Sequence, residues 1–138
     1  CTDCLRSYDN RFVHAYLDWR LALDTADLAL GRTLQLTRWA PVARAAAEHF
    51  CEAYKEAVSQ LGATETWDFD GTTIVRVGGH ALVLGHPLWR IDEAGWNATQ
   101  KSTVTELRGQ GLKVHMTDAR LARSLPNSFL SALFSAHR

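Results

Sequence analysis

Two cysteines at the start of the chain have the spacing of a metal-binding turn. Cys1 and Cys4 form a C-x2-C pair. Two thiolates at this spacing can bind one Zn2+ at about 2.3 Å each, which leaves two coordination positions for other ligands. His14 is a candidate third ligand. The spacing also suits a redox pair or two cysteines without a chemical role, and a lone histidine also suits packing along a helix.

A C-x2-C pair at residue 1 supplies only half of a four-ligand site. We expect the other ligands to lie upstream of Cys1, so the sequence predicts that this chain is the C-terminal part of a longer protein. The third cysteine, Cys51, falls within a helical pattern and is expected to be a buried thiol. Three cysteines do not make a disulfide framework, and they favour a reducing, cytoplasmic environment.

No other group of residues predicts an active site. A restriction-type nuclease needs an acidic residue on one strand and an Asp/Glu-x-Lys on the next, to hold Mg2+ and activate water. Asp68 and Asp70 precede a predicted hairpin, but neither Lys101 nor Lys113 follows a carboxylate by two residues. His86 is interpreted as a structural hydrogen-bonding group at the end of a strand. Because phosphate-binding loops and nucleophile elbows are also missing from the sequence, we predict no catalytic residue in this chain.

Arginines are concentrated in the first third of the chain, with aromatic residues among them. Guanidinium groups beside exposed aromatic rings suit contact with the phosphates and bases of single-stranded DNA. The candidate contacts are Arg6, Arg11, Arg20 and Arg38. The alternative is that the arginines pair with the dense aspartates around them on a solvated face. Trp39 and Trp67 fall in predicted linkers, so we expect them to be exposed when the chain stands alone.

The composition is that of a single globular unit. The chain has 138 residues, of which 46% are hydrophobic and 22% are charged, and its formal net charge is zero. This balance argues against a disordered tail and against a strongly basic surface that wraps DNA. No apolar run approaches the roughly 18–20 residues that span a bilayer, so no membrane partner is expected.

The first half has helical periodicity. Apolar spacing predicts a helix over about residues 12–30, with Asn10 as its N-cap and Gly31 just after its end. A second helix is predicted from Ala40-Pro41 to Gly62, because proline is well tolerated in a first helical turn. A short linker between them favours an antiparallel helical hairpin over residues 1–62.

The second half, residues 63–138, changes to the period of strands. Residues 67–71 are interpreted as a turn, and Gly78-Gly79 predicts a hairpin between strands at 72–77 and 80–84. A helix at 97–108, a strand at 112–116, a helical turn at 118–123 and a last helix at 127–136 follow. The order ββαβα, after the helical hairpin, predicts an α+β or α/β fold in which helices pack on a small sheet.

The motifs at the start of the chain resemble a known family. The sequence reads C-x-x-C-L-R-S-Y-x-N from Cys1 to Asn10, then His14, then L-D-x-R-x-A-L from Leu17 to Leu23. This pattern resembles the cysteine-rich C-terminal domain of MrfA-like DEAD/DEAH-box helicases of superfamily 2, found in bacterial DNA repair and anti-phage defence. A weaker likeness extends over residues 72–126. Repair-type members often carry a further cysteine shortly before the asparagine, so its lack here favours the defence-type branch.

The resemblance implies a set of expectations about function. Cys1 and Cys4 would be one pair of a structural zinc cluster, completed by upstream ligands or in part by His14. The expected partners are the upstream helicase core of the same polypeptide, DNA bound through that parent protein, and other subunits of a defence system. ATP and Mg2+ would be used only by the parent. The alternatives are an active or degenerate restriction-type nuclease or DNA-binding domain over residues 66–126, and a protein–protein docking module.

Overall fold

The computed structural model describes residues 18–53, 55–56, 59, 62–90 and 92–124. The chain divides into two compact units, residues 1–38 and residues 39–138, and each is described by itself. The predicted boundary after residue 62 differs from this division, since the helix that begins at Ala40 belongs to the second unit.

The described part of the first unit is one capped helix and a short turn. Helix α2 spans Trp19–Ala29, and Asp18 is its N-cap with extended backbone angles. The Asp18 carboxylate accepts a hydrogen bond of 2.9 Å from the Arg20 N–H, which satisfies one of the free donors of the first turn. Gly31 follows with a φ of 71°, a left-handed conformation that glycine adopts without strain. The predicted start of this helix near residue 12, and its cap Asn10, lie outside the described residues.

The second unit begins with helix α3, Ala40–Ala53. Pro41 occupies the first turn, where its missing N–H leaves no hydrogen bond unmade. Val42, Ala46 and Phe50 recur at intervals of four residues and are all buried. Because this spacing places them on one face of a helix, α3 packs that face on the sheet. The predicted continuation of the stripe at 54, 57 and 61 lies outside the described residues.

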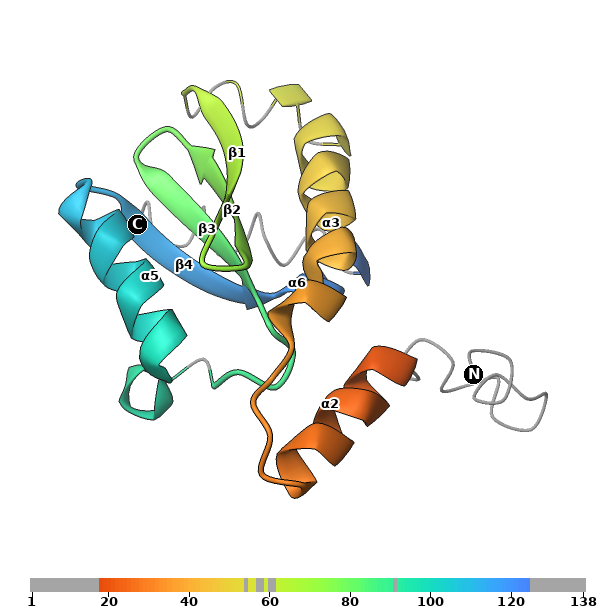
Figure 1. The fold of residues 1–138 in the computed structure, drawn as a ribbon. Coiled ribbons are helices and arrows are strands. Elements are labelled where there is room, and N and C mark those ends of the chain that lie inside the picture. Colours follow the sequence, from red (N-terminus) through yellow and green to blue (C-terminus); the bar gives the residue numbers. More distant parts are fainter. Residues whose placement is uncertain (1–17, 54, 57–58, 60–61, 91, 125–138) are drawn as a thin grey trace. The chain divides into compact units, whose positions relative to one another are not determined.

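A mixed sheet of four strands forms the centre of the second unit (Figure 1). The strands are β1 (Thr64–Phe69), β2 (Thr72–Val77), β3 (His80–Gly85) and β4 (Lys113–Asp118), and they lie side by side in sequence order. The pairs β1–β2 and β2–β3 are antiparallel, whereas β4 runs parallel to β3. The parallel pairing requires a crossover, which helix α5 (Ala98–Gly109) provides.

Both antiparallel connections are two-residue turns. Asp70 and Gly71 have φ values of 48° and 75°, as the turn between β1 and β2 requires of both central residues. Gly78, with a φ of 55°, opens the predicted turn between β2 and β3. The interpretation of residues 67–71 as a turn is wrong for its first three positions, which complete β1. The acidic residues and glycine there suggested a loop, but Trp67 and Phe69 alternate with Asp68 as strand residues do.

The sheet is covered on both faces, giving three layers (Figure 1). Helices α3 and α6 (Ala119–Ser124) cover one face, and α5 covers the other. The buried cluster on the α3/α6 face comprises Ala43, Ala46, Ala47, Phe50, Val75, Val77, Leu82, Leu84, Ala119 and Ala122. The cluster on the α5 face comprises Ile74, Ala81, Val83, Leu107 and Leu112, with Trp67, Phe69, Val114 and Met116 packed against it.

Helix α5 begins with a complete capping box. The Asn97 side chain accepts a hydrogen bond of 2.9 Å from the Gln100 N–H, and the Gln100 side chain accepts one of 3.1 Å from the Asn97 N–H. Gln100 is 1% exposed, and its Nε2 also donates to the Arg90 carbonyl at 2.7 Å and contacts the Met116 sulfur at 3.0 Å. One buried amide therefore links the start of α5, the preceding loop and β4.

The α+β class predicted from the sequence is confirmed, with helices packed on a small mixed sheet. The predicted helix at 97–108, strand at 112–116 and helical turn at 118–123 correspond to α5, β4 and α6. The predicted order ββαβα needs one more strand at its start, because β1 was missed. The last predicted helix, at 127–136, lies outside the described residues.

Candidate functional site

The residues predicted to bind metal lie outside the part of the chain that the structure describes. This applies to Cys1, Cys4 and His14, and also to the arginines Arg6 and Arg11. Among the residues that are described, no group of three or more histidine, cysteine, aspartate or glutamate side chains could hold a metal ion. The zinc site therefore stays a prediction. Cys51 is half-buried, and burial is the main cause that raises the pKa of its thiol.

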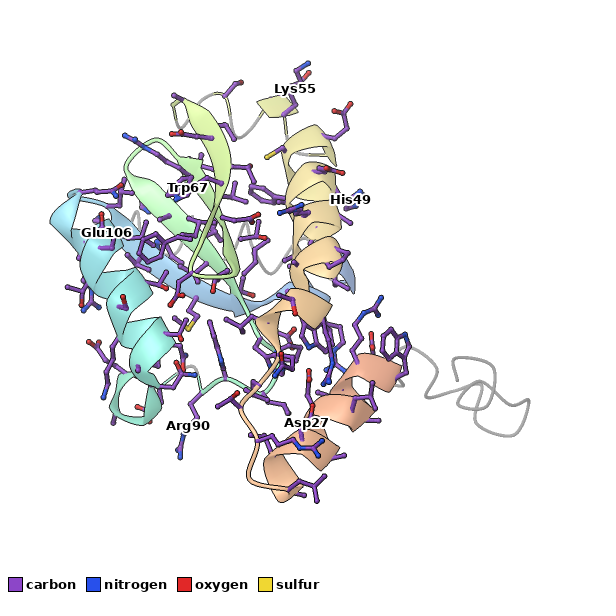
Figure 2. The ribbon with its side chains drawn as sticks, viewed as in Figure 1. Asp27, His49, Lys55, Trp67, Arg90 and Glu106 are labelled. Atoms are coloured by element: carbon purple, nitrogen blue, oxygen red, sulfur yellow. The ribbon has the colours of Figure 1, made fainter. Side chains whose placement is uncertain are left out.

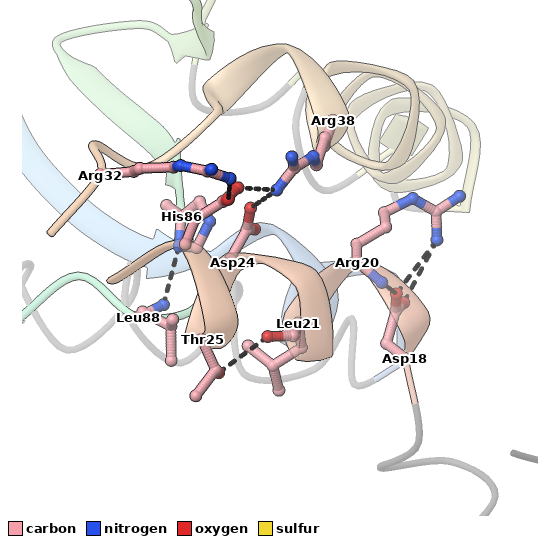
Figure 3. Close-up of polar contacts among 10 residues, drawn as sticks. Asp18, Arg20, Leu21, Asp24, Thr25, Arg32, Arg38, His86 and Leu88 are labelled. Atoms are coloured by element: carbon pink, nitrogen blue, oxygen red, sulfur yellow. Dashed lines mark hydrogen bonds and ion pairs between the residues drawn. The ribbon is translucent and has the colours of Figure 1, made fainter. Parts of the chain in front are cut away.

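Arg38 joins two aspartates of α2 to the segment that follows it (Figure 3). Its Nη1 donates to Asp24 Oδ1 at 2.5 Å and to Asp27 Oδ2 at 2.7 Å. Arg32 donates to the other oxygen of Asp27 at 3.2 Å. Asp24 and Asp27 are three residues apart on the helix, so both carboxylates lie on the same face. The segment that carries Arg32 and Arg38 is thereby held to α2 by ion pairs.

The electrostatics of this network favour its charged form. The hydrogen bond from Arg38 is the main cause that lowers the pKa of Asp27, with Arg32 adding to it and burial opposing it. The same bond raises the pKa of Arg38. Asp24 is fully buried. A buried carboxylate is stable only when it is paired, so Asp24 depends on partners such as Arg38.

Arg20, the other described arginine predicted to contact DNA, also has a carboxylate partner. Its guanidinium lies 3.3 Å from Asp18 and 4.9 Å from the centre of the Trp19 ring. Arg20 thus reinforces the cap of α2 through its side chain and its backbone N–H. A phosphate bound at Arg20 or Arg38 would have to compete with these aspartates. Nucleic-acid contact by these residues stays a prediction.

A small cavity opens where the parallel strands β3 and β4 end. Its volume is about 220 Å3, and it is lined by Gly85, His86, Pro87, Trp89, Arg90, Met116, Thr117 and Asp118. The carboxyl ends of parallel strands are the usual place for a ligand crevice in α/β sheets. Arg90 extends away from the sheet and is largely exposed (Figure 2). A Cβ on Gly85 would approach the Trp89 ring to 2.8 Å, so the indole can pack here only because residue 85 is glycine.

His86 is buried beside this cavity in a fixed orientation. Its Nδ1 accepts a hydrogen bond of 3.0 Å from the Leu88 N–H, so the neutral ring carries its proton on Nε2. Its ring meets Trp39 edge to face, with centroids 5.5 Å apart. Trp39 is 3% exposed, so the expectation that it would be exposed is wrong. Its ring lies in the core because it packs against His86 at the start of α3.

Trp67 also differs from its expected environment. It is half-buried in β1 and packs on the α5 face of the sheet, where Figure 2 shows it between β1 and α5. The alternation of side chains along a strand places it there, on the face opposite to that of Asp68, which pairs with Arg44 of α3. Neither tryptophan therefore provides the exposed apolar face that a docking module would present.

The acidic residues near the sheet do not form a nuclease-type site. Asp118 caps α6 by accepting a hydrogen bond of 2.7 Å from the Arg120 N–H. Asp68 accepts hydrogen bonds from Arg44 and, at 2.8 Å, from the Thr73 hydroxyl. Burial raises the pKa of Asp68, but the hydrogen bonds from Arg44 and Thr73, together with the charge of Arg44, lower the pKa overall. Strands β2 and β3 themselves carry no carboxylate.

Two histidines meet at the other end of the parallel pair. The nitrogens His80 Nδ1 and His115 Nε2 lie 3.0 Å apart, while the ring centroids are 5.3 Å apart. Because the nitrogens are much closer than the centroids, the rings meet edge to edge, and one nitrogen can donate a hydrogen bond to the other in the matching tautomers. Burial, helped by Lys113, lowers the pKa of His115. Sequence reasoning missed this pair, because only the register of β3 on β4 brings together residues 35 positions apart.

Comparisons with family models, with curated proteins and with solved structures find no match to this chain. Among the described helices, none is long and apolar enough to cross a membrane.

Proposed function

We propose that this chain is the C-terminal accessory module of an ATP-dependent DEAD/DEAH-box helicase of a DNA-repair or defence system. The observation that carries the proposal is the motif run from Cys1 to Leu23. Its last part, L-D-x-R-x-A-L, coincides with the start of α2, where Asp18 is the N-cap and Arg20 pairs with it. The motif residues of the described region thus have structural tasks, which suits a module that positions rather than catalyses.

The charged residues around this motif support the same role. Asp24 and Asp27 are occupied by Arg38, so the acidic face of α2 holds the linker to the helix. In the proposed module, α2 follows the cysteine pair in sequence, and the segment after α2 is held to it by these ion pairs. ATP-driven movement along DNA would be performed upstream, in the helicase core.

The donor set at the start of the chain fits a structural zinc ion. Thiolates are preferred ligands of Zn2+, and Cys1 and Cys4 would supply two of the four required, with His14 a candidate for a third. The remaining ligands would come from upstream residues. Such a site would tie the module to the helicase body, because an ion bound by both parts links their folding.

Among the described residues, nothing favours the nuclease alternative. A metal-dependent nuclease would need carboxylates converging on the ends of two adjacent strands. The nearest candidates, Asp68 and Asp118, are instead engaged with Arg44 and with the first turn of α6.

The test is the zinc content of the protein, measured by elemental analysis, with any sequence encoded upstream of Cys1 included. We expect one zinc per chain, lost when Cys1 and Cys4 are both changed to serine. Cys51→Ser is the matched control, since this thiol lies within α3, and it should leave the zinc content unchanged. A protein that holds no zinc, or that keeps it in the double serine variant, would overturn the proposal.

A further inference from the structure

Helix α2 presents its charged side chains to the segment that follows it and leaves its apolar side chains exposed. Asp24 and Asp27 bind Arg38, and their side chains are 0% and 13% exposed. The opposite arrangement is usual, because a helix normally buries its apolar stripe and exposes its charged residues. The exposed residues form what we call the apolar face of α2, which comprises Trp19, Ala22, Leu23, Ala26, Ala29 and the C-cap Leu30.

The apolar face is continuous and is shaped to receive another element. Trp19, Leu23 and Leu30 are 37%, 46% and 67% exposed, and their spacing of four and seven residues places them on one side of a helix. Alanines lie between these large side chains, so large and small apolar residues alternate along the face. Such a surface interdigitates with a second apolar surface. The face is therefore suited to contact with apolar side chains.

Two of the three parts of the first compact unit are already in contact. The unit comprises residues 1–38. The segment after α2 is bound to the charged side of the helix through Arg32 and Arg38. The remaining part, residues 1–17, lies outside the described residues and joins α2 directly at the N-cap Asp18. Because the charged side is taken by the segment after α2, the apolar face is the side left open for residues 1–17.

The backbone at Asp18 lets the preceding chain turn back along α2. Its φ of -125° and ψ of 122° are extended, so α2 begins at Trp19 and its helical path does not pass through residue 18. A single straight helix over residues 12–30 would carry its first part away from the apolar face. With the break at Asp18, the preceding residues can instead run alongside that face.

Residues 5–17 have an apolar stripe of their own. Leu5, Tyr8, Phe12 and Tyr16 recur at intervals of three and four residues, the spacing of one side of a helix. Two such stripes bury each other when their helices pack side by side. The lengths also match, since residues 5–17 as a helix would span about 20 Å and the 11 residues of α2 span about 16 Å.

We propose that residues 5–17 of this chain pack on the apolar face of α2. The area of the face favours this occupant over a second copy of the chain. The three large side chains of an 11-residue helix expose less than the roughly 800 Å2 per partner that a specific interface between proteins buries. A segment joined to the helix at Asp18 needs no such area, because its effective concentration beside α2 is high.

This packing also determines where two of the metal-binding candidates lie. Cys4 directly precedes the segment and His14 lies within it, so the contact would hold both beside α2. The inference does not rest on the proposed function, because the contact is apolar and requires no metal ion. A protein without zinc would leave it standing.

Photo-cross-linking of the full chain tests which segment covers the apolar face. A residue that carries benzophenone replaces Leu23 in one protein and Leu28 in another. The two leucines are a matched pair, since both belong to α2 and are 46% exposed, but Leu28 lies off the apolar face. We expect the probe at position 23 to form cross-links to residues 5–17, identified by mass spectrometry, and the probe at position 28 to form few or none there.

The proposal requires that these cross-links join residues of the same chain. Equal amounts of unlabelled and 15N-labelled chain are mixed before irradiation, because a link between two copies then combines both labels. Links between copies would show that a second chain covers the face and would overturn the proposal. The proposal also fails if position 23 forms no links to residues 5–17, or if position 28 forms them in equal yield.

Amide hydrogen exchange supplies a second measurement that needs no probe. Leu23→Ser should speed exchange in residues 5–17 by at least about tenfold, because it removes apolar contact from the segment. Leu28→Ser should leave exchange in that segment unchanged. Circular dichroism checks that both variants keep the folded sheet. If the two serine variants exchange alike in residues 5–17, the segment does not pack on the apolar face.

Discussion

Each of the two compact units of this chain is stabilised internally by a different kind of interaction. In the described part of the first unit, α2 exposes Leu23 and Leu28 by 46% each, and its polar contacts include a cap and a set of ion pairs. In the second unit, the sheet buries an apolar cluster on each face. A helix of 11 residues has only marginal stability of its own in water, so Asp18 and the aspartate–arginine network contribute to the order of α2.

Because different interactions stabilise them, the two units should respond to different perturbations. Burial of apolar surface involves no titrating group, whereas an ion pair is lost when its carboxylate is protonated and is weakened in part by salt. Changes to the core should therefore affect the second unit globally. Changes to caps and charges should affect α2 locally.

The largest expected effect comes from the core. Phe50 is fully buried in the cluster on the α3/α6 face. Phe50→Ala should lower the free energy of unfolding by about 3–5 kcal/mol, because it removes buried surface and leaves a cavity. Leu28→Ala, an apolar truncation on the exposed side of α2, should change it by no more than roughly 0.5 kcal/mol. Urea unfolding followed by circular dichroism measures both, and equal losses would contradict the division between the units.

An intermediate effect is expected from the two helix caps. Asn97→Ala removes the cap of α5 and should lower the free energy of unfolding by about 1 kcal/mol, since α5 is part of the second core. Asp18→Ala removes the corresponding cap of α2. Its effect should be confined to α2, as faster amide hydrogen exchange within Trp19–Ala29 without a shift in the unfolding midpoint of the sheet. If the midpoint shifts as far as it does for Asn97→Ala, α2 unfolds together with the core.

The smallest expected effect is a pH dependence that separates the units. The pKa of His115 is lowered in the folded protein by burial and by Lys113, while its Nε2 faces His80. As the pH falls, His115 is therefore protonated in the unfolded chain before it is protonated in the folded protein. The contribution of His115 to stability is complete above the ordinary histidine pKa of about 6.5, and it is lost as the pH falls below that value.

Asp27 behaves differently, because its lowered pKa belongs to an acid. Its contribution is complete above the ordinary aspartate pKa of about 4 and is lost only as the pH falls further. Between pH 7 and 5 the sheet should therefore weaken while α2 does not. Urea unfolding at both pH values measures this, and His115→Gln should reduce the difference. A variant with the full pH dependence of the unmodified protein would show that other groups cause it.

Local patterns were sufficient to predict much of the fold. The apolar stripe through Phe50 and the glycine pair at Gly78 each specify an element through its immediate neighbours. β1 was missed because its signal is divided between two faces. Thr64, Thr66 and Asp68 are exposed, so only Trp67 and Phe69 show the alternation of a buried strand.

The polar contacts between side chains were less predictable than the elements, because they join residues that are far apart in the sequence. The pairing of Arg44 with Asp68 joins a helix to a strand 24 residues away, and the contact between His80 and His115 requires a parallel register. Composition near Arg38 indicated that carboxylates were available, but it could not indicate which of them the arginine would bind. The cysteines that carry the functional proposal lie outside the described residues, so no contact bears on them.

The burial of β3 on both faces has a consequence for how its register is set. All six residues of β3 are buried, and Ala81 and Val83 face one helix layer while Leu82 and Leu84 face the other. Apolar residues on both faces carry little information about which face is which, so a slip by one residue would violate no hydrophobic pattern within the strand. The register of β3 is therefore set at its start. The two-residue turn at Gly78-Gly79 aligns β3 with β2, and the parallel pairing with β4 begins at His80. The most deeply buried strand is thus specified by a turn at the surface.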